Sequence, residues 1–246
     1  MSNTIMRLSK IAVTAGAFLT FASQAQAVEL IVNGGFETGD YSGWTRFEEP
    51  NFAGGLYIVA NANGNSPLSN SDYVANPNGG EWFSITDQTG SGAYALTQSF
   101  TIARAGNVTV SFDMFANDWS GQGPVGGRDP GVGPTQNAVV DILFGGAAPF
   151  TENPADIAAS LYGPGTDGPN PPYPWTSYSY DVFLAPGAYT IRFAESDNLL
   201  YFNQGVDNVS IDAVGVPEPA TWAMMIGGLA VAGGAVRSRR RVLAVA

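Results

Sequence analysis

The chain has no cysteine and no histidine among its 246 residues. Without cysteine it cannot form disulfides, so its stability must come from a packed core, from a bound metal ion, or from both. Without histidine it has no Ser-His-Asp or Cys-His catalytic arrangement and none of the usual zinc ligand sets. Any metal site must therefore use oxygen ligands, and this favours a hard cation such as Ca²⁺.

Basic residues are scarce in the central part of the chain. Residues 28–215 contain four arginines and twenty aspartates and glutamates, a net charge of −16, against −11 for the whole chain. Such an acidic surface repels phosphate backbones and anionic lipid headgroups, and nucleic acid is therefore not an expected partner. The same surface suits solubility and the binding of divalent cations or neutral ligands.

The N-terminal segment has the pattern of a secretory signal peptide. Two basic residues, a short apolar run over residues 11–21 and an A-x-A cleavage site at Ala25 and Ala27 follow one another in that order. We therefore expect residues 1–27 to be removed on export. The mature chain is expected to begin near Val28.

The C-terminal segment, residues 216–246, contains a second apolar run. Residues 221–236 carry no charge and would span roughly 24 Å as a helix, against about 30 Å of hydrocarbon in a bilayer, which predicts a marginal transmembrane helix. Prolines border the run on one side, and a basic cluster on the other indicates the end that stays in the cytoplasm. The bordering motif is Pro217, Glu218 and Pro219, and the basic cluster is Arg237, Arg239, Arg240 and Arg241.

This order of a P-E-P motif, a short apolar helix and a terminal arginine cluster resembles the PEP-CTERM sorting signal of exopolysaccharide-producing Gram-negative bacteria. The resemblance implies that an exosortase, a membrane enzyme of transpeptidase type, acts at the P-E-P motif. The protein would then be anchored transiently in the inner membrane before it reaches the cell envelope or the extracellular matrix. A permanent single-span anchor is the alternative, because the length of the apolar run does not exclude it.

Residues 28–215 have the length of one domain with its own core. Short segments rich in β-branched and aromatic residues alternate there with clusters of Gly, Pro, Asn and Asp, and no helical period persists for three turns. We expect strands over residues 29–32, 56–60, 81–85, 94–102, 107–116, 138–144, 177–184, 188–196 and 206–214. This pattern predicts an all-β domain, a two-sheet β-sandwich of jelly-roll type.

The two ends of this domain resemble those of carbohydrate-binding, galactose-binding-like jelly rolls. Residues 29–45 have the N-G-x-F-E pattern followed by G-W, and residues 202–214 are similar to the closing strand of those modules. The resemblance implies a structural Ca²⁺ held by Glu37 and Asp207, whose alternative role is to cap turns or lie in solvent. A cation that joins the first and last strands would replace the missing disulfides.

Sugar recognition requires exposed aromatic rings that stack on pyranose rings, together with polar groups that bind the hydroxyls. Trp119, Tyr173 and Trp175 are the candidates, because they lie at the edges of two Gly/Pro-rich loops over residues 120–136 and 162–175. Anchoring of these loops against the sandwich is the alternative role of the three rings.

The sequence thus predicts an exported protein with a non-catalytic, carbohydrate-binding-like β-sandwich, working at the envelope or in the extracellular polysaccharide of a biofilm. An exosortase and a polysaccharide are the expected partners, and Ca²⁺ is the expected structural cofactor. A structural or adhesive matrix protein without a defined sugar ligand is the first alternative. A polysaccharide-active enzyme that uses two carboxylates is the second, although among twenty acids no pair stands out.

Overall fold

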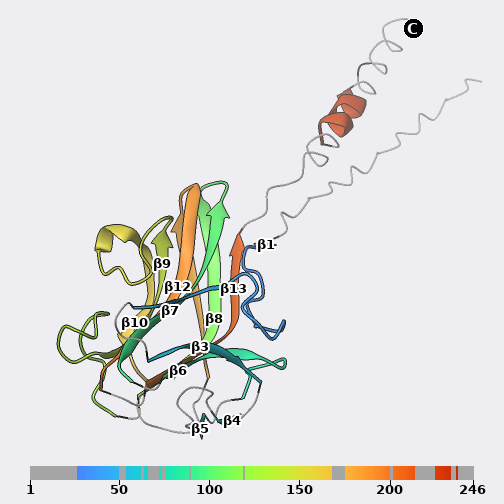
Figure 1. Cartoon of the computed structure of the whole chain (residues 1–246). Helices are drawn as coiled ribbons and strands as arrows, with labels where there is room; N and C mark the ends of the chain where they lie inside the picture. The colour runs from blue at the N-terminus through green and yellow to red at the C-terminus, as the bar shows by residue number, and fades with distance from the viewer. Residues whose placement is uncertain are drawn as a thin grey trace, which may run out of the picture. The chain divides into compact units, whose positions relative to one another are not determined.

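Figure 1 shows the chain as a computed structural model. The structure describes residues 27–49, 54–61, 64–65, 72–73, 76–88, 90–118, 120–167, 175–199, 202–213, 225–233 and 237. Residues Ala27–Gly215 form one compact unit, here called the sandwich domain, and it contains all the hydrophobic clusters found in the described chain. The sandwich domain therefore has a complete core of its own.

Two antiparallel sheets build the sandwich domain. The first has the strand order β11-β8-β13-β6-β3, with β1 paired to β13, and the second has the order β10-β9-β12-β7-β2. The strands are β1 (Val28–Glu29), β2 (Thr45–Glu48), β3 (Gly55–Ala60), β4 (Gly64–Asn65), β5 (Asp72–Tyr73), β6 (Phe83–Gln88), β7 (Gly92–Ile102), β8 (Gly106–Asp118), β9 (Gln136–Phe144), β10 (Ile157–Gly165), β11 (Thr176–Leu184), β12 (Gly187–Asp197) and β13 (Phe202–Ala213). Strands β4 and β5 form a small separate pair.

The connectivity is that of a jelly roll. Among strands β6 to β13, the chain crosses to the other sheet at every connection except the one between β9 and β10, which pair with each other. One sheet therefore holds the order β6-β13-β8-β11 and the other the order β7-β12-β9-β10. The predicted two-sheet β-sandwich is therefore confirmed, and each of the nine predicted strands overlaps a strand of the structure. The first and last strands are neighbours, because Val28 pairs with Ala213 and Glu29 with Asp212.

Alternate residues of the long strands fill the space between the sheets, which lie over one another in Figure 1. The buried sets are Val108, Val110, Phe112 and Met114 in β8 and Tyr189, Ile191 and Phe193 in β12. Trp44 joins this core, since its ring centroid lies 5.5 Å from that of Phe36 and 6.2 Å from that of Phe193. Its indole Nε1–H donates to the carbonyl of Asn33 at 3.0 Å, and burial of the ring thus leaves no unpaired donor.

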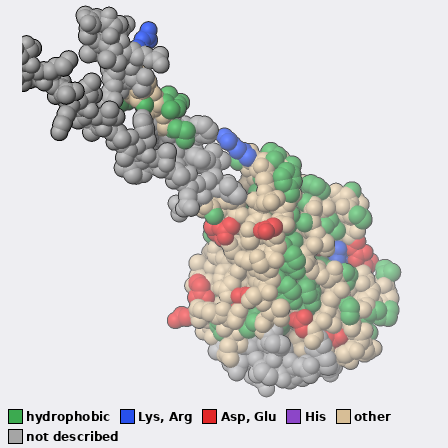
Figure 2. Space-filling view, turned by 180° about the vertical axis from the view of Figure 1, so that it is seen from behind, with side chains coloured by type: hydrophobic (Ala, Val, Ile, Leu, Met, Phe, Trp, Pro, Cys, Tyr) green, Lys and Arg blue, Asp and Glu red, His purple; other side chains and the backbone are tan. Residues whose placement is uncertain are grey.

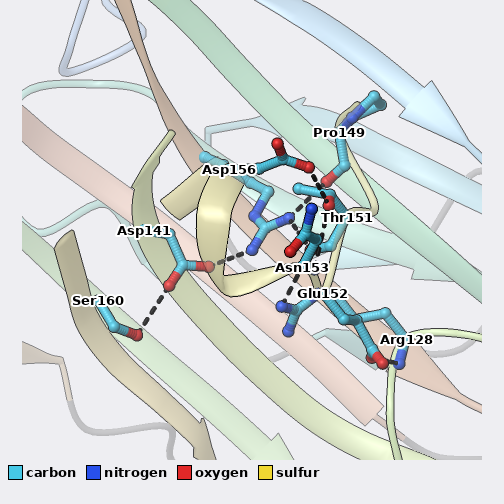
Figure 3. Close-up of polar contacts among 9 residues, drawn as sticks. Arg128, Asp141, Pro149, Thr151, Glu152, Asn153, Asp156 and Ser160 are labelled. Atoms are coloured by element: carbon cyan, nitrogen blue, oxygen red, sulfur yellow. Dashed lines mark hydrogen bonds and ion pairs between the residues drawn. The ribbon is translucent and has the colours of Figure 1, made fainter. Parts of the chain in front are cut away.

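A buried arginine fixes the loop between β9 and β10 to the outer face of the second sheet. Arg192 of β12 forms an ion pair with Asp141 of β9 and donates to the carbonyls of Pro149 and Thr151, at 2.9 Å each (Figure 3). Asp141 also accepts from the Ser160 hydroxyl at 2.8 Å. The guanidinium and the carboxylate are almost fully withdrawn from solvent, so each depends on the other for charge compensation.

A second arginine binds the same loop from the segment that joins β8 and β9. Arg128 donates through its guanidinium to the carbonyl of Thr151 at 3.2 Å, and its backbone N–H donates to the carboxylate of Glu152. The loop ends in the 3-10 helix η1 (Pro154–Asp156), which Asn153 caps by accepting from the N–H of Ala155. Two of the four arginines of the sandwich domain, Arg128 and Arg192, are thus buried against this loop.

The described part of the C-terminal apolar run is a helix over residues 225–233. No helix within the described ranges is long and apolar enough to cross a membrane. The transmembrane helix predicted over residues 221–236 is therefore not confirmed.

Removal of the Asp141 carboxylate tests the buried ion pair. Asp141→Ala leaves the Arg192 guanidinium buried without its counter-charge, and we expect the free energy of unfolding to fall by about 3–5 kcal/mol. The double variant Asp141→Ala/Arg192→Met removes both charges and should lose less than the single variant. Urea unfolding of the sandwich domain at neutral pH measures both changes. Arg104→Met, at an exposed position, is the control, and an Asp141→Ala variant as stable as this control would contradict the assignment.

Candidate functional site

The loop after β1 adopts a strained backbone where it meets the last strand. Asn33 has a φ of 54°, Phe36 of 58° and Asn208 of 50°, and these are the non-glycine residues with positive φ in the described chain. A left-handed conformation costs such residues on the order of 1–3 kcal/mol and persists only where the surroundings impose it. Asn208 lies at the bulge of β13, between Asp207 and Ser210. Strain is thus concentrated at the junction of the opening loop and the closing strand.

A close backbone contact holds this junction together. The carbonyl of Gly34 accepts from the N–H of Val209 at 3.0 Å. A Cβ atom on Gly34 would lie 1.8 Å from the Val209 carbonyl oxygen, so the approach requires glycine at this position. The turn that begins at Asn33 therefore binds the opening loop to β13 through the backbone of Gly34.

The structure brings the two predicted calcium ligands, Glu37 and Asp207, to this junction. The Glu37 carboxylate accepts from the backbone N–H of Glu81 at 2.9 Å and of Trp82 at 3.1 Å. The Asp207 carboxylate is fully buried and accepts from the backbone N–H of Asn78 at 2.9 Å. Both carboxylates are thus oriented by the same segment, residues 78–82, just before β6.

Further oxygen atoms surround the two acids. Asp113 of β8 pairs with Asp207 across the strands, and its carboxylate accepts from the side-chain amide of Asn208 at 2.8 Å. A Cβ atom on Gly35 would lie 3.6 Å from the Asn208 amide oxygen and 3.7 Å from a carboxylate oxygen of Asp207. It would also lie 3.6 Å from Cγ of Glu37. The donor set around Gly35 consists of oxygen, and this is the chemistry that a hard cation requires.

The electrostatics at this junction favour a cation. Burial raises the pKa of Asp207 to about 7, backbone hydrogen bonds from Asn78 and Asn208 oppose the shift, and the negative charges of Asp113 and Glu37 add to it. A bound cation would reverse that effect by stabilising the carboxylate form. The described residues contain no group of three or more acids close enough to hold a metal by themselves, so amide or backbone oxygens would have to complete the coordination.

Trp175, one of the three predicted sugar-binding rings, is half-buried in a packing contact. Its ring meets Phe83 edge-on with centroids 5.6 Å apart and Phe115 with centroids 4.8 Å apart, and its Nε1–H donates to the carbonyl of Asn76 at 2.8 Å. These contacts fit the alternative role of a loop anchor, and ligand contact by Trp175 stays a prediction. The predicted site residues outside the described part of the chain are Ala25, Trp119, Tyr173, Pro217, Glu218, Pro219, Arg239, Arg240 and Arg241. Ala27 and Arg237 are described and exposed.

Three half-exposed tyrosines gather at one open edge of the sandwich, and we call them the tyrosine edge. Tyr178 and Tyr180 follow each other on the inner face of β11, with ring planes 7° apart and centroids 6.5 Å apart. Tyr162 of β10 meets Tyr178 edge-on with centroids 5.4 Å apart, and its hydroxyl donates to the Asp167 carboxylate at 3.4 Å. Phe112 supports Tyr178 from the core. Rings and a carboxylate at a surface edge are the groups that a sugar requires.

The tyrosine edge was not predicted from the sequence. The i, i+2 spacing of Tyr178 and Tyr180 places both rings on one face of the strand predicted over residues 177–184. The rings remain half-exposed because β11 is the last strand of its sheet. That position depends on long-range pairing, which the local spacing does not reveal.

Among the buried acids, Glu195 and its neighbour Asp197 offer the strongest case for catalysis. Glu195 of β12 is fully buried, accepts from the Thr86 hydroxyl at 2.9 Å and lies opposite Tyr94 across the strands. Burial raises the pKa of Glu195 well above its usual value, and the charge of Asp197 adds to the shift. A neutral carboxylic acid of this kind can serve as a general acid. Glu195 and Tyr94 are both withdrawn from solvent, however, so a polymeric substrate does not reach them in this arrangement.

The surface charge of the sandwich domain is predominantly negative. Arg46 and Arg104 are the exposed arginines in its described part, while Arg128 and Arg192 are buried. Figure 2 shows acidic side chains spread over one face with few basic side chains among them. The accessible surface is therefore better suited to cations and neutral ligands than to polyanions.

The C-terminal segment matches a known sorting motif. Residues 215–241 match the PEP-CTERM protein-sorting motif, which confirms the predicted sorting signal. The motif implies an exported protein of the cell envelope that an exosortase recognises. No curated protein matches the chain.

Solved structures with a distant likeness cover most of the chain. The carbohydrate-binding module TmCBM61, in complex with β-1,4-galactotriose, is 15% identical over 75% of this chain and 97% of its own, with a TM-score of 0.45. The Stig cyclase Fisc of Fischerella sp. TAU is 16% identical over 78% of this chain and 100% of its own, with a TM-score of 0.49. The CBM22-1 xylan-binding domain of Paenibacillus barcinonensis Xyn10C is 12% identical over 80% of this chain and 99% of its own, with a TM-score of 0.42. These likenesses are too distant to indicate a function.

The raised pKa of Asp207 gives metal-free protein a specific pH dependence. The pKa lies at about 7 in the folded state against 3.8 in a free side chain, so its contribution to stability is complete below pH 3.8 and is lost as the pH rises through 7. With a chelator present, the wild-type melting temperature should therefore fall over this range relative to that of Asp207→Asn. Thermal melts of both proteins at a series of pH values measure the difference. Parallel curves would show that Asp207 titrates normally.

Proposed function

We propose that the protein is exported, anchored transiently in the inner membrane by residues 221–236 and cleaved by an exosortase at Pro217, Glu218 and Pro219. The sandwich domain then acts in the envelope or the extracellular matrix as a non-catalytic polysaccharide-binding protein. The PEP-CTERM motif supports the sorting step. The net charge of −16 on residues 28–215 suits a domain that works outside the cell without binding nucleic acid or anionic lipid.

Ca²⁺ is the structural cofactor in this proposal, with Glu37 and Asp207 as its carboxylate ligands. The support is the convergence of both acids at the junction of the opening loop and β13, together with the amide oxygen of Asn208 close by. Calcium takes six to eight oxygen ligands at about 2.3–2.6 Å from carboxylates, amides, backbone carbonyls and water, so two carboxylates suffice as the charged part of the set. A cation here would stabilise the closure of the sandwich.

The observation that best supports polysaccharide binding is the tyrosine edge. Tyr162, Tyr178 and Tyr180 present half-exposed rings beside Asp167. The Asp167 carboxylate already accepts from the N–H of Ala116 at 2.6 Å and from the Tyr162 hydroxyl at 3.4 Å, and its remaining lone pairs can accept from sugar hydroxyls. No hydrogen bond or ion pair of this group, as far as the described residues show, involves a basic side chain. The ligand class that fits is a neutral glycan, because an anionic one would meet uncompensated negative charge.

Substitution of the tyrosines tests this function. Tyr178→Ala and Tyr180→Ala should each weaken binding of the sandwich domain to a neutral polysaccharide about tenfold, the equivalent of about 1.4 kcal/mol, because each removes a stacking surface. Affinity electrophoresis in gels that contain single neutral polysaccharides from a bacterial and plant panel measures the effect.

The matched control is Phe183→Ala, which removes an exposed aromatic ring from the opposite face of the same strand and should leave binding unchanged. Near-ultraviolet circular dichroism verifies that each variant is folded, since Tyr178 also packs on Phe112. Saturable binding that survives both tyrosine substitutions would exclude the tyrosine edge as the site. Release of new reducing ends from the polysaccharide would favour the enzyme alternative.

A further inference from the structure

In the part of the chain that the structure describes, the free edge of β11 (Thr176–Leu184) lacks the features that keep a sheet edge from pairing. The strand orders of the two sheets end at β11 and β3 and at β10 and β2, and the two-residue strand β1 lies beside β13. An end strand presents a row of unpaired N–H and C=O groups to any other strand that can approach. Natural proteins protect such edges with charges, prolines, bulges, short length or coverage by other segments.

The other three end strands show such protection. Strand β2 has only four residues, and two of these, Arg46 and Glu48, are charged. Strand β10 has three register shifts against β9 and contains Pro164, which has no N–H to donate. Strand β3 has six residues, and all of its side chains are at least partly buried.

Among the residues that the structure describes, strand β11 shows none of these protections. Its nine residues pair one-to-one with β8 without a register shift, and it contains no proline and one charged residue, Asp181. Its outward-facing positions are exposed, and the Phe183 side chain is 69% exposed. Within the described ranges β11 pairs with β8 alone. A straight, weakly charged edge with an exposed aromatic ring favours association with another strand.

We propose that β11 is a self-association edge, at which two copies of this protein pair as antiparallel strands around a two-fold axis. The register follows from the strand itself. Tyr180 is the midpoint of Thr176–Leu184, so the register that pairs all nine residues places Tyr180 opposite Tyr180 of the second copy. Asp181 then lies opposite Ser179 of the second copy, and no two like charges face each other.

Other registers are less favourable. A shift that centres the axis on Asp181 places two aspartates opposite each other and leaves residues at the strand ends unpaired. The full register instead aligns tyrosine with tyrosine, a type of cross-strand pair that stabilises sheets. Because the contact is the same on both copies, it closes as a dimer and does not extend into a fibre.

The charge of the domain determines how the association responds to salt. Each copy carries about −16 over residues 28–215, so the two copies repel each other at a distance, and salt screens that repulsion. The dimer should therefore become tighter as the ionic strength rises. The dimer also brings two tyrosine edges together, and two linked sites would bind one polysaccharide with increased avidity. This gain in avidity rests on the proposed function, whereas the pairing of the strands does not.

Charge substitutions at the paired positions test the proposal by sedimentation equilibrium of the sandwich domain at low and high salt. Ser179→Asp places an aspartate opposite Asp181 of the second copy, twice per dimer, and should weaken dimerisation at least about tenfold, or about 1.4 kcal/mol. Adding Asp181→Lys to this variant makes both contacts attractive and should restore the dimer. Asp181→Lys alone faces serine and should dimerise at least as well as the wild type.

Ser99→Asp is the matched control, because it adds the same charge at an exposed position of β7, away from β11, and should leave dimerisation unchanged. A wild-type domain that stays monomeric at all concentrations and salt levels would overturn the proposal. So would equal dimerisation of the wild type, Ser179→Asp and the double variant, since the dimer would then use another surface. Polysaccharide binding by a monomeric wild type would leave the proposed function standing while refuting the self-association edge.

Discussion

The closure of the sandwich between the opening loop and the last strand is the constraint on which the rest of the structure depends. Strand β13 lies between β8 and β6 in the first sheet and also pairs with β1, so the chain completes its sheet only when its last strand is inserted. No disulfide can hold that strand, because the chain has no cysteine. The Gly34–Val209 contact and the hydrogen bond from the N–H of Asn78 to the Asp207 carboxylate help to hold it instead, at the cost of three strained residues.

The distribution of charge links this closure to the surface. Two of the four arginines of the sandwich domain are buried, and one of them, Arg192, neutralises Asp141 beneath the loop between β9 and β10. The acids at the closure have no such partner in the described chain, and burial therefore raises the pKa of Asp207. What remains outside is strongly acidic, and this favours a cation at the closure, a neutral ligand at the tyrosine edge and salt-dependent contact between copies.

The sequence predicted the core strands and the closure, because alternation and turn residues are local signals. The calcium ligands Glu37 and Asp207 were predicted from a resemblance at both ends of the domain, and their role stays a prediction. Strand β10 was missed, since IAASLYGPG has no clear alternation and is held in place by pairing with β9. The tyrosine edge and the free edge of β11 were missed for a related reason, because strand order decides which strands lie at an edge.

A calcium titration of the sandwich domain by isothermal calorimetry tests the closure most directly. We predict one saturable Ca²⁺ site per domain that is lost in Glu37→Gln and in Asp207→Asn, and retained in Glu48→Gln, an exposed acid on β2. Calcium at 100 times its dissociation constant should then stabilise the wild type by about 2.7 kcal/mol. No binding by the wild type, or undiminished binding by Glu37→Gln, would contradict the claim that a cation bound by these acids stabilises the closure of the sandwich.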